Sequence, residues 1–126
     1  MYKRQKIRCA TLLSSPFLTC IGNDFGYESV FSHSIELLGG QGDLLVTISS
    51  SGNSPNIIEA AYSARKKKMK ILSLSGFAPD NRSRQLGDYS IYVPISQYGI
   101  VESIHTLLLQ QVIDSIIEID SFQTTD

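Results

Sequence analysis

The chain has 126 residues, of which 42% are hydrophobic and 18% are charged, and its formal net charge is -1. This length and composition fit one globular domain over residues 1–126 that buries its own apolar core. A charge this close to neutral argues against non-specific nucleic-acid binding, which needs a basic excess. The sequence shows no secretory leader and no apolar run long enough to span a bilayer, so we expect a cytoplasmic protein without a membrane partner.

The two cysteines, Cys9 and Cys20, lie in apolar stretches and form no CxxC pair. A zinc site built on cysteine spacing is therefore not predicted. We expect both to be reduced residues of the core rather than a disulfide or a metal pair.

The first third of the chain predicts one strand and one helix. Ile7–Leu13 is an apolar run typical of a strand. Phe25–Leu38 carries apolar residues at helical spacing, and the glycine-rich segment at 39–42 ends that helix.

The clearest strand is Asp43–Ser49, whose continuous apolar run predicts burial on both faces, as in a central parallel strand. A helix is predicted from Ser54, because Pro55 suits the first helical position. The basic run Arg65–Lys68 is interpreted as the solvated end of this helix, where cations meet the negative end of the dipole.

The rest of the chain continues the alternation of strand and helix. The predicted elements are a strand at Met69–Ser75, a short helix within Phe77–Gly87, a strand at Tyr89–Val93, a long helix at Ile100–Ile119 and a frayed polar tail at Ser121–Asp126. The long helix is so apolar that we expect it to be buried in the domain or against another subunit. This order predicts an α/β three-layer sandwich, with helices on both faces of a central parallel sheet.

The segment Ser49-Ser50-Ser51-Gly52-Asn53-Ser54 joins the clearest strand to the helix that follows it. Ligands of open parallel sheets bind at the carboxyl ends of strands, and a helix start offers unpaired N–H groups to an anion. Serine hydroxyls and Gly52 suit a tetrahedral anion, whereas the lack of a Walker lysine and of GxGxxG spacing argues against ATP and NAD. The alternative is that Ser54 only caps the helix and the other serines are turn residues.

The segment from Asp43 to Ile58 resembles the core of sugar isomerase (SIS) domains, and within them the phosphoheptose isomerase group. Ile21–Ser32, Met69–Gly76 and Tyr98–His105 match further segments of that group. The resemblance covers about residues 7–119. It implies a flavodoxin- or Rossmann-like fold, a sugar-phosphate ligand and a homo-oligomer, a tetramer in full-length relatives.

The resemblance also implies roles for individual residues. The implied ligand contacts are Ser49, Ser51 and Ser54 at the phosphate with Ser50 beside them, and Asn23 and Asp24 at the sugar chain. Glu102 stands where phosphoheptose isomerases carry a Gln that contacts substrate and metal.

Besides the carboxylate of Glu102 in place of an amide, two features depart from the family pattern. The N-terminal helices that carry a Gly-Asn-Gly-Gly-Ser-type phosphate loop and the catalytic Glu are missing, and Met1–Gln5 resembles nothing in the family. We therefore expect a fragment, or a gene with a false start, that has little isomerase activity alone. The His expected two turns after the Gln position is Gln110 here, so the ligands of the family's zinc are not retained and no cofactor is assigned.

Two residues of the last helix are candidate catalytic groups. Glu102 is interpreted either as a general base near C1 and C2 of a ketose or as an acidic residue that stabilises the helix start. His105 lies one turn later on the same face, and it is either a structural residue that hydrogen-bonds nearby or a catalytic one.

Three functions remain open at this stage. The first is an aldose–ketose phosphate isomerase in surface-glycan or nucleotide-sugar precursor synthesis, which moves a proton between C1 and C2 through an enediol. The second is a non-catalytic sugar-phosphate-binding or regulatory SIS protein of the type that associates with a replication initiator. The third is an α/β domain whose serine loop is incidental.

Overall fold

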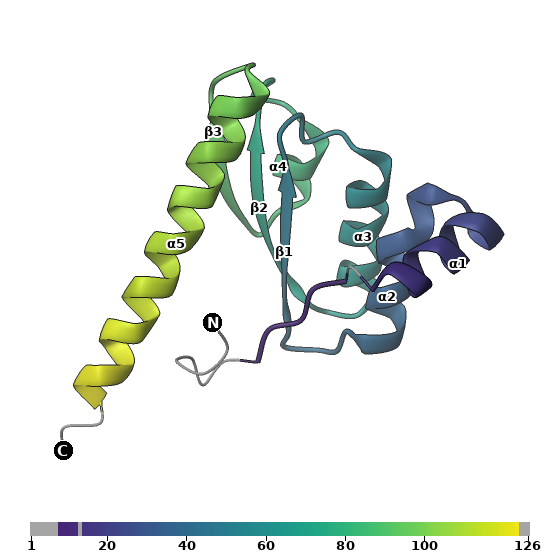
Figure 1. The fold of residues 1–126 in the computed structure, drawn as a ribbon, viewed down its shortest axis with the longest axis horizontal. Helices are drawn as coiled ribbons and strands as arrows, with labels where there is room; N and C mark the ends of the chain where they lie inside the picture. The colour runs from purple at the N-terminus through teal and green to yellow at the C-terminus, as the bar shows by residue number, and fades with distance from the viewer. Residues whose placement is uncertain (1–7, 13, 124–126) are drawn as a thin grey trace.

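The computed structural model describes residues 8–12 and 14–123, arranged as Figure 1 shows. In chain order the elements are α1 (Ser15–Phe25), the 3-10 turn η1 (Tyr27–Ser29), α2 (Val30–Leu38), β1 (Leu44–Ser49), α3 (Pro55–Lys66), β2 (Lys70–Gly76), α4 (Arg82–Leu86), β3 (Tyr89–Val93) and α5 (Tyr98–Gln123). The strands form one parallel sheet in the order β1-β2-β3, in which Ser49 lies opposite Ser75 and Gly76 opposite Val93.

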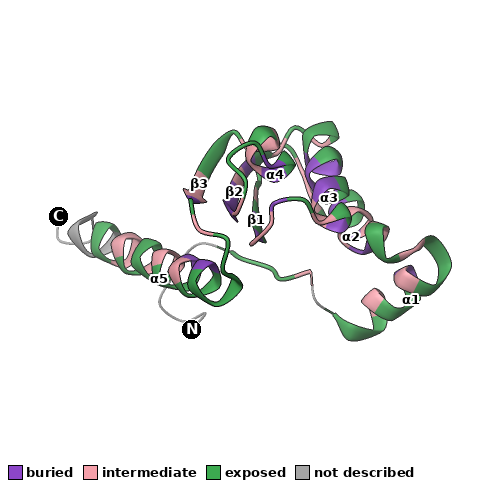
Figure 2. Cartoon of the chain, turned by 90° about the horizontal axis from the view of Figure 1, so that it is seen from above, coloured by how far each residue is buried: buried purple, intermediate pink, exposed green. Residues whose placement is uncertain are grey.

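Helices flank this sheet, as predicted. The core lies between α2, α3 and one face of the sheet, and its buried residues are Ile35, Ala60, Ala61, Ala64 and Ile71. The helix α5 lies on the other side of the sheet from α2 and α3 (Figures 1 and 2). The α/β fold class with a central parallel sheet is therefore confirmed.

The order of the strands corrects two predictions for the sheet. Residues 8–12 form no strand, whereas Ile7 and Leu13 lie outside the described residues. The strand β1 is consequently an edge strand of the sheet, and its side chains Leu44, Val46 and Ile48 are exposed on the face away from α3. The prediction that β1 is buried on both faces is wrong, because α5 covers only the carboxyl end of the neighbouring strand β2.

The predicted helix at Phe25–Leu38 is interrupted near its start. Gly26 has a φ of 89°, a value that L side chains rarely adopt, and the chain turns there between α1 and η1. The helix α2 therefore begins only at Val30, and α1 is an element that the pattern did not indicate.

The remaining elements confirm the predicted order, with short shifts at their ends. The strand Tyr89–Val93 is observed as predicted, and the basic residues Arg65 and Lys66 are exposed in the last turn of α3. Within the predicted tail, residues 121–123 continue α5 and residues 124–126 lie outside the described part.

Both cysteines are free, and both are exposed. The prediction that they belong to the core is therefore wrong. Cys20 lies on the outer side of α1, with its Sγ 3.7 Å from Oδ2 of Asp24, and Cys9 lies in the segment that forms no strand.

The helix α5 is largely uncovered, as the green and pink ribbon of Figure 2 shows. Leu107 and Ile119 are 68% and 58% exposed. By length and composition alone Tyr98–Ile119 could cross a membrane, so the expectation that no run is long enough is wrong by this measure. Core helices of soluble proteins pass the same test, and the absence of a membrane partner stays a prediction.

Candidate functional site

The serine loop, residues 49–54, leaves the carboxyl end of β1 and turns into α3. Its tight bend depends on Gly52, which has a φ of 66° and whose N–H lies 3.1 Å from both the carbonyl oxygen and the Oγ of Ser49. An added Cβ at Gly52 would overlap the side chain of Asn81. Both the backbone angle and the lack of space therefore require glycine at this position.

The loop hydroxyls retain protons that can be donated to a ligand. Ser51 Oγ accepts from the N–H of Asn53 at 3.3 Å, which leaves its own proton free. The Oγ atoms of Ser49 and Ser54 lie 3.3 Å apart, so one donates to the other and the second proton stays available. Ser50 differs from these three, because its Oγ donates to Oε1 of Glu102 at 3.3 Å.

The start of α3 supplies a backbone N–H and the positive end of the helix dipole beside these hydroxyls. Ser54 occupies the N-cap position, but its side chain makes no capping hydrogen bond to the helix. The interpretation of Ser54 as only a cap is therefore not supported. Pro55 has no N–H, and the N–H of Ile57 donates to Asn56 Oδ1 and to the Ser54 carbonyl, so the backbone N–H of Asn56 is the first-turn donor left for a ligand. The positive end of the helix dipole lies there. The arrangement suits a phosphate or another tetrahedral anion.

The beginning of α4 holds the loop in place. The N–H of Ser83 donates to the carbonyl of Gly52 at 2.8 Å, and the N–H of Arg82 donates to Oδ1 of Asn53 at 3.0 Å. Asn81 is only 2% exposed, and its Nδ2 contacts Oγ of Ser75 and the carbonyls of Gly76 and Ala78, at 3.1, 3.2 and 2.8 Å. Asn81, Arg82 and Ser83 thus form a clamp on the loop. The sequence analysis did not predict this clamp, because an Asn after Pro79-Asp80 is typical of an ordinary turn.

The helix α5 brings Glu102 to the loop. Val101 is fully buried against Gly76, where an added Cβ would lie 2.8 Å from Cγ1 of Val101. This close approach anchors the first turn of α5 at the carboxyl end of β2. Glu102 is the next residue, and its exposed carboxylate reaches Ser50. A carboxylate beside an anion-binding loop is a chemically suitable group for moving a proton on a bound ligand.

His105 lies one turn further along α5 and is 1% exposed. Its Nε2 lies 3.3 Å from the carbonyl oxygen of Ser75, whereas Nδ1 has no hydrogen-bond partner among the described residues. This burial against β2 favours the structural interpretation of His105 over a catalytic one. Both interpretations stay predictions.

Asn23 and Asp24 lie near the end of α1, on the outer side of the molecule. Asn23 Nδ2 donates to Oδ1 of Asp24 at 2.9 Å, and the hydrogen bonds of their side chains in the described chain stay within α1. The structure joins Ser49, Ser50, Ser51, Ser54 and Glu102 at one site and gives Asn23 and Asp24 no bond to it. Their role at a sugar chain stays a prediction.

The described residues do not fit the zinc that the family resemblance suggests. No group of three or more His, Cys, Asp or Glu side chains in residues 8–12 and 14–123 could hold a metal ion. Glu102 is the acidic residue at the loop, and the buried Nε2 of His105 faces a carbonyl oxygen instead of an open position.

Comparisons with known proteins identify the family of the chain. A family model described as "SIS domain" matches residues 5–76, more than half of the chain. The phosphoheptose isomerase of Hamiltonella defensa is 45% identical over 93 residues, which are 73% of this chain and 45% of that protein. The phosphoheptose isomerase of Buchnera aphidicola is 37% identical over 113 residues, which are 85% of this chain and 58% of that protein.

Solved structures of phosphoheptose isomerases share the fold of this chain. Phosphoheptose isomerase from Neisseria gonorrhoeae superposes with a TM-score of 0.84 at 34% identity, over 88% of this chain and 63% of that one. A phosphoheptose isomerase from Francisella tularensis gives a TM-score of 0.80 at 26% identity, over 85% and 58% of the two chains. The chain thus spans about half the length of the curated relatives it matches. By the family match and the shared fold, the chain belongs to the SIS domain family.

Proposed function

We propose that the serine loop binds the phosphate of a sugar phosphate. The observation that carries this proposal is the set of free hydroxyl protons at Ser51 and in the Ser49–Ser54 pair, gathered at the start of α3. A phosphate offers oxygen acceptors to these donors, and the helix dipole favours its charge.

The proposed substrate class and reaction are supported by the relatives, which are named phosphoheptose isomerases. We propose that the whole protein interconverts an aldose phosphate and a ketose phosphate, in surface-glycan or nucleotide-sugar precursor synthesis. The phosphate on the loop anchors the substrate, and the Glu102 carboxylate accepts a proton during transfer between C1 and C2. Ser50 holds this carboxylate at the loop through its hydrogen bond.

Binding is tested by replacing Ser51 and Ser54 together with alanine. The thermal stabilisation of the chain by sedoheptulose 7-phosphate should shrink, because ligand stabilisation follows affinity. Each lost hydrogen bond to a charged group is worth about 1.5–3 kcal/mol, so affinity should fall more than tenfold. Ser115→Ala serves as the control, because its hydroxyl only contacts the Gln111 carbonyl within α5. Equal stabilisation of wild type and double variant would refute the proposal.

Catalysis is tested by exchange of a carbon-bound substrate proton with solvent deuterium. An isomerase exchanges it through the enediol, whereas a non-catalytic sugar-phosphate-binding protein does not. Because little activity is expected of this chain alone, exchange is measured in the whole protein, where Glu102→Gln should abolish it and leave the thermal shift by the ligand intact. Exchange at the wild-type rate in this variant would remove Glu102 from the mechanism.

We also propose that the chain self-associates and works in the cytoplasm. The support for self-association is the apolar surface of α5, where Leu107, Val112 and Ile119 are exposed. Exposed patches of this kind mark interaction sites.

A further inference from the structure

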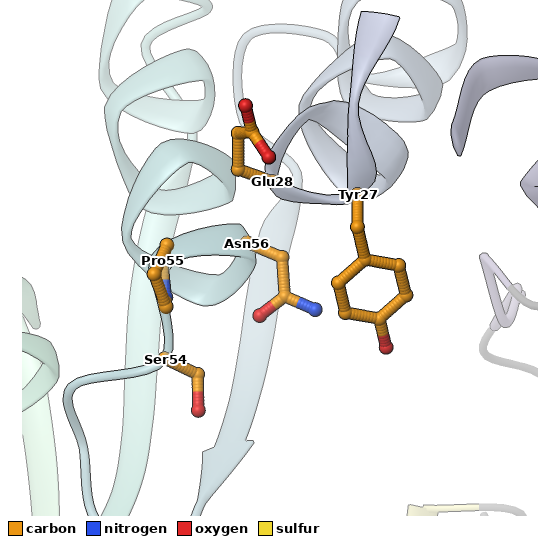
Figure 3. A pocket seen from close by; sticks show the side chains of 5 residues that line it. All are labelled: Tyr27, Glu28, Ser54, Pro55 and Asn56. Carbon is orange, nitrogen blue, oxygen red and sulfur yellow. The ribbon is translucent and has the colours of Figure 1, made fainter. Parts of the chain in front are cut away.

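The serine loop and Glu102 reach the proposed site from opposite sides of the sheet. The loop lies with α3 and α4, whereas Glu102 belongs to α5 on the other side (Figures 1 and 2). A cavity of about 320 Å³ beside the loop does not join them, because its lining belongs to η1, the loop and the first turn of α3 (Figure 3). The lining residues are Tyr27, Glu28, Ser54, Pro55 and Asn56. The place of Glu102 relative to the loop is therefore set by how α5 is held on the sheet.

The helix α5 is held on the sheet over a short length. Within residues 98–119, the buried side chains are Val101 and His105, which lie four positions apart on one face of the helix. Val101 packs against Gly76, whereas Nε2 of His105 lies 3.3 Å from the carbonyl oxygen of Ser75. A hydrogen bond is directional in a way that an apolar contact is not. His105 thus fixes the second turn of α5 on β2, one turn after Glu102.

The hydrogen bond of His105 assigns the tautomer of its ring. A carbonyl oxygen only accepts, so Nε2 carries the proton, and Nδ1 of the neutral ring carries none. Nδ1 is buried and has no partner among the described residues. A buried polar atom without a partner is unfavourable, so histidine is a poor residue for packing alone at this position. What it adds over an apolar side chain is the directed bond to Ser75.

Ser75 is the residue against which both halves of the site are held. It is fully buried, and it lies opposite Ser49, the first residue of the loop, in the pairing of β2 with β1. Its Oγ accepts at 3.1 Å from Nδ2 of Asn81, the side chain that packs against Gly52. Its carbonyl faces His105. The loop and α5 are therefore positioned against the same residue of β2.

We propose that His105 is a positioning residue for proton transfer, which holds Glu102 in place relative to a phosphate on the serine loop through its bond to Ser75. The inference rests on the proposed function, in which the loop anchors the substrate and Glu102 accepts a proton. A base must lie within hydrogen-bond reach of the proton that it removes, and a misplacement of about 1 Å can lower the rate about a hundredfold. The phosphate is bound by donors of the loop and of α3. Loss of the His105 bond should therefore lower the rate and leave the affinity.

The test compares His105→Leu with His105→Gln in the whole protein. Leucine fills the space without a donor, whereas the amide nitrogen of glutamine stands as far along the side chain as Nε2 and can donate to Ser75. Exchange of a carbon-bound proton of sedoheptulose 7-phosphate with solvent deuterium gives two quantities, the rate at saturating ligand and the ligand concentration at half of that rate. Ser103→Ala is the control, because its Oγ also donates to a carbonyl, that of Gly99 at 2.6 Å, but within α5.

His105→Leu should lower the saturated rate about 10–100-fold and change the half-saturating concentration less than about threefold. His105→Gln should recover the rate to within about threefold of wild type, and Ser103→Ala should stay within about twofold. A wild-type rate in His105→Leu would overturn the positioning role and leave the loop and Glu102 standing. The role would also be overturned by a rate in His105→Gln as low as in His105→Leu, or by a loss of affinity as large as the loss of rate. Absence of exchange in the wild type would refute the proposed reaction itself.

A second measurement does not depend on the folding of a variant. Above about pH 8, where an ordinary histidine is neutral, the ¹⁵N NMR spectrum of the chain should show His105 with a proton on Nε2 and none on Nδ1. A ring with its proton on Nδ1, or one that averages between the two tautomers, would overturn the bond to Ser75 and the proposal with it.

Discussion

At the carboxyl end of the sheet, the elements on its two sides differ in how completely they are held by hydrogen bonds and packing. On the side of α4, the serine loop is held by hydrogen bonds from the N–H groups of Arg82 and Ser83, and the side chain of Asn81 packs against Gly52. On the side of α5, Val101 and His105 in the first two turns pack on the sheet. The rest of this apolar helix projects beyond the sheet, with Leu107 and Ile119 exposed. The first region has a defined geometry before any ligand arrives. The second is a surface suited to another molecule.

The largest effect is expected from Gly52→Ala, because Gly52 lies in the hydrogen-bonded serine loop itself. Alanine at a φ of 66° is strained and would overlap Asn81, so unfolding free energy should fall by about 3 kcal/mol in urea titration. Gly42→Ala is the matched control, because Gly42 also has a positive φ of 93° but nothing within 4 Å of an added Cβ. Its cost should be about 1–2 kcal/mol. Equal losses of unfolding free energy for Gly52→Ala and Gly42→Ala would contradict the close packing of Asn81 against Gly52.

Asn81→Ala should have the next largest effect. It removes the Nδ2 contacts to β2 and the α4 cap, in which Oδ1 accepts from the N–H of Arg84 at 2.9 Å. We expect a loss of about 2–3 kcal/mol in the free energy of unfolding, measured by urea titration. Asn53→Ala, an exposed partner in the same clamp, should lose less than about 1 kcal/mol. A reversed order of the two variants would show that the clamp is not centred on Asn81.

A substitution on the exposed apolar face of α5 should have the opposite effect. It should change self-association and leave the stability of the monomer almost unchanged. Leu107→Lys places a charge on an exposed position of α5, so monomer stability should stay within about 0.5 kcal/mol. Sedimentation velocity should show a shift toward smaller species, because burying the charge in an interface is costly. Gln111→Lys changes an exposed polar residue of the same helix and is the control. Unchanged sedimentation of Leu107→Lys would exclude this face of α5 from the contact.

The smallest effect is expected at Asp88, which lies away from both regions. Its pKa is held below the ordinary value of 3.8 because the N–H of Ile71 donates to Oδ2 at 2.9 Å and Lys70 Nζ lies 3.3 Å from Oδ1. A lowered pKa contributes stability above pH 3.8 that is lost as the pH falls through the folded value. Asp88→Asn should therefore lower Tm slightly at pH 7, with a difference that vanishes at strongly acidic pH. A difference that grows on acidification would contradict this assignment.

Local patterns predicted much of the sheet and the loop. The helix start at Pro55 and the strand Tyr89–Val93 each depend on neighbouring residues, and both predictions are correct. The hydrogen bond from Ser83 to Gly52 joins residues 31 positions apart in the chain. The spacing of apolar residues along the sequence does not reveal a contact of this kind.

The wrong predictions for the strand at Ile7–Leu13, the helix across Gly26 and the burial of β1 also have physical causes. The strand predicted at Ile7–Leu13 has the right residue types, but a strand also needs a partner ladder, which residues 8–12 do not form. The helical spacing across Gly26 continued in the sequence although the backbone turned there. Burial of β1 was inferred from its apolar run, whereas its outer face depends on what distant elements cover.

The order β1-β2-β3 means that each strand pairs with the strand that precedes it in the chain. Each crossover helix therefore returns the chain to the edge just formed, and the sheet can grow by successive addition while the protein is being synthesised. The serine loop and its contacts with α4 are complete once Val93 has emerged from the ribosome. The helix α5, which places Glu102, follows the three strands in chain order, so its docking site on β2 can form before it is synthesised.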